Sequence, residues 1–122
     1  MNEATVLTAA EERLADIIWQ NAPLTSPELV ALTNKKLDWK KSTTYTVLRK
    51  LCDKGIFKNE NAVVTALLTR DELIARQSRQ FVAETFGGSL PGFIASFVGG
   101  QKLSSNEAEE LKQLIESYRE EE

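Results

Sequence analysis

Histidine is absent from this 122-residue sequence, and cysteine occurs once, at Cys52. These shortages exclude histidine-based acid–base catalysis, Cys/His nucleophile pairs and most zinc or copper sites. A single cysteine cannot form an intramolecular disulfide, which favours a reducing compartment such as the cytoplasm. We therefore expect a protein that is not an enzyme and that needs no metal or other cofactor.

Long hydrophobic runs are also missing. The most apolar stretch, residues 86–98, contains three glycines and a proline and is shorter than the roughly 18 residues that cross a bilayer. The first residues show neither the basic flank nor the apolar core of a signal peptide. The proportions of hydrophobic and charged residues, 42% and 27%, are those of a folded globular protein. We expect a soluble cytoplasmic chain.

An overall excess of positive charge is absent too, because 18 acidic residues outnumber 15 basic ones. The distribution is uneven, however, and residues 35–58 hold eight basic residues against Asp38 and Asp53. We call these eight the basic patch: Lys35, Lys36, Lys40, Lys41, Arg49, Lys50, Lys54 and Lys58. A local cluster of this kind is typical of a surface that binds nucleic acid.

Helix starts are marked by a Ser or Thr that is followed three residues later by Glu. This pattern occurs at Thr8, Thr25, Thr69 and Ser104. With the hydrophobic spacing, it predicts helices over residues 9–20, 26–35, 41–54, 70–85, 90–98 and 105–119. Apolar and β-branched runs over 56–58 and 62–68, separated by residues 59–61, predict a β-hairpin.

Three helices followed by a hairpin are typical of a winged helix-turn-helix. The sequence therefore predicts a mainly α fold with a small β-hairpin. We expect a winged-helix DNA-binding domain over residues 1–69 and a helical dimerisation domain over 70–122. Trp19, at the end of the first predicted helix, is expected to be a packing residue of the core.

The helix over 41–54 coincides with the basic patch, and a helix-turn-helix protein inserts this element into the major groove. Its spacing assigns Thr44, Val47, Leu48 and Leu51 to the core. The polar residues between them and just before the helix are candidate DNA-binding residues, because cations neutralise phosphates and Thr offers a hydroxyl and a methyl to base edges. They are Lys40, Lys41, Ser42, Thr43, Thr46, Arg49 and Lys50. A plain solvated helix face is the alternative.

The C-terminal half carries more apolar surface than its short helices can bury against one another. Seven residues form the expected interface of a two-fold homodimer: Phe81, Phe86, Leu90, Phe93, Phe97, Leu114 and Tyr118. The alternative is an appendage that folds back onto the winged helix. A dimer also fits DNA binding, because a symmetric dimer matches a palindromic operator.

Three segments resemble the BlaI/MecI/CopY family of penicillinase-type repressors. They are LADIIW in the first helix, LDWKKSTTYTVLRKLCDKG leading into the hairpin, and FGGSLPGFIASFV before the last helix. The similarity runs from about Thr8 to Ser117, and its most specific residues include Trp39, Thr43 and Thr46. The resemblance implies a dimeric winged-helix repressor on a short palindromic operator.

The same resemblance implies derepression by proteolysis, carried out by a membrane-bound sensor metalloprotease. In β-lactam-responsive members the cut precedes the Phe of an Asn-Phe-Val segment, and the matching residues here are Ser96 and Phe97, with serine in place of asparagine. The hairpin also departs from the family pattern, with Glu60 at the expected wing tip and Ala66 where proline is usual.

Two functions of different classes follow from these observations. The first is a dimeric repressor that binds a palindromic operator through helix 41–54 in the major groove. The second is a winged-helix adapter that binds proteins and no longer binds DNA, which the negative net charge and the acidic wing favour. The basic patch favours the repressor, since an adapter has no need for eight cations around one helix.

Overall fold

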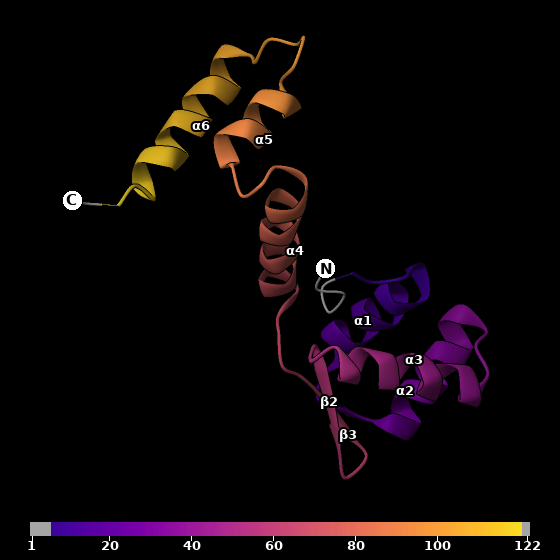
Figure 1. The fold of residues 1–122 in the computed structure, drawn as a ribbon. Helices are drawn as coiled ribbons and strands as arrows, with labels where there is room; N and C mark the ends of the chain where they lie inside the picture. Colours follow the sequence, from indigo (N-terminus) through magenta and orange to yellow (C-terminus); the bar gives the residue numbers. More distant parts are fainter. Residues whose placement is uncertain (1–5, 121–122) are drawn as a thin grey trace.

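The computed structural model describes residues 6–120 of the chain. Figure 1 shows the N-terminal helices and a small sheet packed together, and a further helix that leads away from them toward the C-terminal helices. The elements are α1 (Ala9–Asn21), β1 (Leu24–Thr25), α2 (Ser26–Leu37), α3 (Lys41–Asp53), β2 (Phe57–Glu60), β3 (Val63–Ala66), α4 (Arg70–Thr85), α5 (Leu90–Phe97) and α6 (Ser105–Ser117). The predicted fold class is confirmed.

Three of the four predicted capping boxes form completely. The hydroxyls of Thr8, Thr25 and Thr69 each accept the amide of the Glu three residues on, and that Glu carboxylate accepts the amide of the cap. At Ser104 only the first of these bonds forms. Each bond satisfies an amide that the first helical turn leaves without a partner. The caps therefore fix where α1, α2, α4 and α6 begin.

The sheet has three antiparallel strands in the order β1-β3-β2. The hairpin prediction is confirmed, but the predicted position of its turn is wrong: Asn59 and Glu60 belong to β2, and Asn61 and Ala62 form the turn with φ of 51° and 61°. Two positive φ values in succession match the right-handed twist of the flanking strands. Strand β1 was not predicted, because two residues are too few for a periodic pattern.

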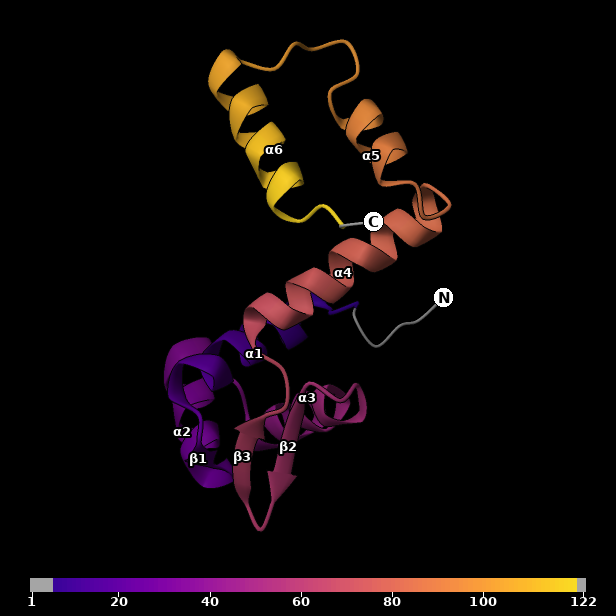
Figure 2. The same cartoon turned by 90° about the vertical axis from the view of Figure 1, so that its left-hand side faces the viewer.

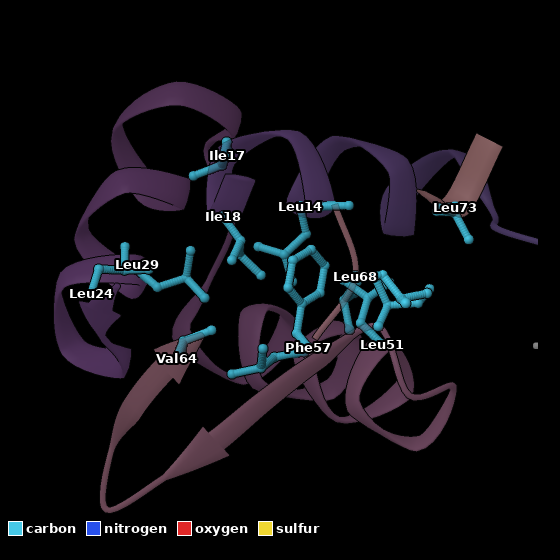
Figure 3. Packing of buried hydrophobic residues seen from close by; sticks show 14 residues of the cluster. Leu14, Ile17, Ile18, Leu24, Leu29, Leu51, Phe57, Val64, Leu68 and Leu73 are labelled. Carbon is cyan, nitrogen blue, oxygen red and sulfur yellow. The ribbon is translucent and has the colours of Figure 1, made fainter. Parts of the chain in front are cut away.

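The core lies between α1, α2, α3 and the sheet (Figure 3). Leu14, Ile18, Leu29, Leu51 and Phe57 are among its fully or almost fully buried members. The four residues assigned to the inner face of helix 41–54 are all buried, as predicted: Thr44, Val47, Leu48 and Leu51. This core accounts for the stability of the winged helix, since apolar burial contributes about 25 cal/mol per Å².

Packing is sparse beyond the winged helix. Leu73 is the buried residue of α4, and α5 and α6 contain none. Figures 1 and 2, from two directions, show α5 and α6 standing apart from α1–α3. Helices α5 and α6 therefore do not fold back onto the winged helix. Within residues 6–120, no helix is both long and apolar enough to cross a membrane.

Candidate nucleic-acid interface

Helix α3 presents one face to the core and the other to solvent. Its inner face packs against α1, α2 and β2. All seven predicted DNA-binding residues are exposed: Lys40, Lys41, Ser42, Thr43, Thr46, Arg49 and Lys50. The helix therefore offers cations and hydroxyls on a continuous outer face, on a backbone that the core holds in place.

The turn between α2 and α3 is held by hydrogen bonds on both sides. The buried hydroxyls of Thr33 and Thr44 lie 2.5 Å apart and join the two helices. The Trp39 amide donates to the Thr33 carbonyl at 3.3 Å, and the Asn34 side chain donates to the Trp39 carbonyl at 3.2 Å. Asp38 ends α2 in the left-handed region, with φ of 56°. These bonds fix the angle at which α3 leaves α2.

Two of the eight cations in the basic patch are engaged within the protein. Lys54 Nζ lies 2.8 Å from Glu11 Oε1 and donates to the Val6 carbonyl at 2.7 Å. Lys58 Nζ lies 3.1 Å from Glu60 Oε2 within the hairpin. The other six form no ion pair with any of residues 6–120: Lys35, Lys36, Lys40, Lys41, Arg49 and Lys50. The positive charge that remains available is therefore concentrated on α2 and α3.

Glu11 is a buried carboxylate that the sequence did not single out as an ion-pair partner. Burial alone raises its pKa, but the Lys54 ammonium and the amide and hydroxyl of Thr8 outweigh that effect and lower the pKa below its ordinary value. The pair joins residues 43 positions apart in sequence, so no local pattern could reveal it. Lys54 is thus a structural residue and not part of the outer face of α3.

The predicted interface residues of the C-terminal half form two groups. Four rings make a chain of edge-to-face contacts, with centroids 5.6–6.0 Å apart: Phe81, Phe86, Phe93 and Phe97. Leu90 and Leu114 are exposed on α5 and α6, and Tyr118 is exposed directly after α6. Between these two helices lies an open, largely apolar groove of about 380 Å³, whose lining includes Phe93, Phe97 and Leu114.

A model of the penicillinase repressor family matches residues 7–117. The chain belongs to the penicillinase repressor family. It is 24% identical to the penicillinase repressor of Bacillus licheniformis over 98% of this chain and 96% of that protein. It is 23% identical to the methicillin resistance regulatory protein MecI of Staphylococcus aureus strain N315 over 93% of this chain and 96% of the relative. The protein is therefore a transcriptional repressor and not an enzyme.

The two residues that the sequence analysis marked as a possible cleavage site, Ser96 and Phe97, lie in the last turn of α5. Ser96 and Phe97 are both exposed in this penicillinase repressor family member, and Phe97 keeps 74% of its surface accessible. Val98 ends α5, Gly99 and Gly100 follow it, and Gly100 adopts φ of 77°. The segment after Phe97 is therefore a break between α5 and α6 rather than part of a continuous helix.

Proposed function

We propose that this repressor acts as a homodimer in the cytoplasm and binds a palindromic operator with α3 in the major groove. The observation that carries the proposal is the outer face of α3, where seven residues predicted from the sequence are exposed together. The three hydroxyl residues suit base edges, and the four cations suit phosphates or guanine. Family membership supports the same function.

Dimerisation through residues 70–122 follows from apolar surface that the protomer leaves in water. Phe97, Tyr118 and Leu114 are 74%, 81% and 54% exposed, and all three belong to α5 and α6 or end them. A groove flanked by such side chains is suited to a second copy of the same two helices, because a two-fold interface uses the same surface on both partners. Two winged helices related in this way match the symmetry of a palindrome.

We also propose that proteolysis between Ser96 and Phe97 relieves repression, with a membrane sensor metalloprotease as the partner. A cut at this bond detaches Phe97 and all of α6 from the winged helix. The dimer then loses a large share of its apolar interface, and each monomer retains a single α3. Affinity for a palindrome then falls, because the two half-sites must be bound by two separate monomers instead of by one dimer.

The test of the DNA function is selection of duplexes from a random library at low salt. Enrichment of a palindrome is expected. If the dimer makes on the order of eight phosphate contacts, log K falls with log salt at a slope of about −7. The adapter alternative has one structural observation in its favour, the pairing of Lys58 with the wing carboxylate Glu60. No enrichment together with a flat salt response supports the adapter and overturns our proposal.

A further inference from the structure

The direction of α4 is set by its first turn. Leu73 is its one buried residue, and the helix then extends away from the winged helix toward α5 (Figure 2). A groove of about 250 Å³ remains open between α1 and α4 near Leu7, Ile74 and Gln77. The contacts made by residues 68–73, where α4 begins, are therefore well placed to set the angle between α4 and α1.

Arg70, the first residue of α4, makes two contacts with α1. Its Nη1 lies 2.5 Å from Asp16 Oδ1, and its Cζ lies 4.9 Å from the centre of the Trp19 ring. A guanidinium in this position is attracted both by the carboxylate and by the face of the indole. Arg70 is thus held to α1 from two directions.

The Trp19 ring is itself fixed. Its Nε1 donates to the Leu68 carbonyl at 2.9 Å, two residues before Arg70. Its ring lies 5.2 Å from that of Phe57, which is buried in the core. Trp19 therefore contacts the chain on both sides of Thr69, the cap of α4, and provides a rigid surface against which Arg70 rests.

We infer that Arg70, Asp16 and Trp19 form a clamp that fixes the angle between the winged helix and α4, and so sets the half-site spacing that the dimer accepts. The inference rests on the proposed function. Each base pair added between half-sites moves one α3 site by about 3.4 Å and rotates it by about 34°. A dimer with a rigid junction rejects such a change, whereas a dimer with a loose junction follows it. Arg70 is here a positioning residue and need not touch DNA.

The experiment compares Arg70→Ala and Asp16→Asn with the wild-type protein on the palindrome obtained by selection. Its central spacer is lengthened or shortened by one and two base pairs. The readout is the ratio of affinities for the preferred and altered spacers, in which general changes in charge cancel. We expect this ratio to fall at least about threefold in both variants, the factor typical of losing an exposed ion pair or cation–π interaction. Arg79→Ala, which removes the same charge nine residues further along α4, should keep the wild-type ratio.

A second measurement does not depend on DNA. Spin labels are attached at Ala31→Cys and Ala83→Cys, two exposed positions, in a Cys52→Ser background. They report the distance between α2 and α4. Labelled chains are diluted in unlabelled protein, so that only distances within one protomer are measured. The Arg70→Ala distribution should be broader than that of the wild type. Wild-type spacing ratios in both variants, or an unchanged distance distribution, overturn the clamp. Failure of the wild-type protein to bind any palindrome instead overturns the proposed function, and the clamp with it.

Discussion

Lys54 shows how a cation in a DNA-binding region can serve the fold instead of the ligand. It ends α3, where it joins the carboxylate of Glu11 on α1 and the carbonyl of Val6. Glu11 is 2% exposed, and its Oε2 has no hydrogen-bond partner within the described structure. Without Lys54 this carboxylate is a buried charge with no cation beside it, which is costly.

Lys54→Ala should lower the free energy of unfolding by roughly 1–3 kcal/mol at pH 7, the range for a charged hydrogen bond whose partner stays buried. The pKa of Glu11 is lowered in the folded protein, so its contribution is present above the ordinary value of 4.5 and is lost as pH falls through the folded value. The difference between wild type and variant should therefore shrink below about pH 4.5.

Urea unfolding at neutral and acid pH measures this difference. Lys50→Ala is the matched control, because it removes the same side chain from an exposed position of α3 and should stay within about 0.5 kcal/mol of wild type. Equal stability of Lys54→Ala and wild type at neutral pH would contradict the structural role of the pair.

Thr46 and Lys50 should affect DNA binding differently. The Thr46 hydroxyl donates to the Ser42 carbonyl at 2.9 Å, which leaves its methyl and an oxygen lone pair for a base edge. Thr46→Ala should lower the ratio of operator affinity to random-DNA affinity. The loss corresponds to roughly 1–3 kcal/mol of binding free energy. Lys50→Ala should weaken both affinities alike and reduce the salt slope by about one for each phosphate that the variant no longer neutralises. Titrations of each variant against both duplexes at several salt concentrations separate the two effects. Unchanged operator binding in both variants would show that α3 is not the reader.

Helices were predictable from this sequence where their ends carry local signals. Thr8, Thr25 and Thr69 form the expected capping boxes, and Gly55 follows α3 in the left-handed region, with φ of 79°. The hairpin turn was not located, since Asn59 and Asn61 are equally good turn residues and the strand register decides between them. The pairs Glu11–Lys54 and Arg70–Asp16 were not foreseen, because they depend on the packing of whole elements.

The wing carries an acidic residue, Glu60, directly before the turn at Asn61 and Ala62. Lys58 and Glu60 form an ion pair along β2, at 47% and 69% exposure, so the carboxylate offsets the cation nearest to the turn. Glu60→Lys should raise affinity for operator and random DNA alike, because it adds a cation and releases Lys58. The salt slope should steepen by about 0.9 for each additional phosphate that is neutralised.

Glu60→Gln separates the two effects, since it releases Lys58 without adding charge of its own. Its affinity should fall between those of the wild type and Glu60→Lys, measured by titration of one operator duplex. A gain confined to the operator would show that the wing reads sequence. No gain in either variant would show that the wing lies away from the duplex.

The two halves of the molecule differ in how much of their apolar surface is buried within one protomer. In the winged helix, α1–α3 and the sheet bury theirs within one protomer. In α5 and α6 no residue is buried, although Leu90, Phe97, Leu114 and Ile115 each expose more than half of their surface. The sequence predicted this surplus from its apolar pattern alone, but the geometry of a two-fold partner depends on a second chain.

Leu114→Asp tests the proposed dimer more cleanly than a change at Phe93, because Phe93 packs against Phe81, Phe86 and Phe97 within the protomer. Leu114 is 54% exposed and lines the groove between α5 and α6.

A buried leucine contributes about 1.5–3 kcal/mol, and a two-fold interface contains it twice, so the dimer Kd should rise roughly 10²- to 10⁴-fold. Sedimentation velocity should then show monomers with an intact winged helix, and operator affinity should fall with them. Gln113→Asp adds the same charge at the neighbouring exposed position, outside the groove lining, and should leave the dimer intact. If Leu114→Asp remains dimeric, the proposed interface is wrong. The exposed side of α4, where Ile74 and Phe81 are each 50% accessible, is then the next candidate.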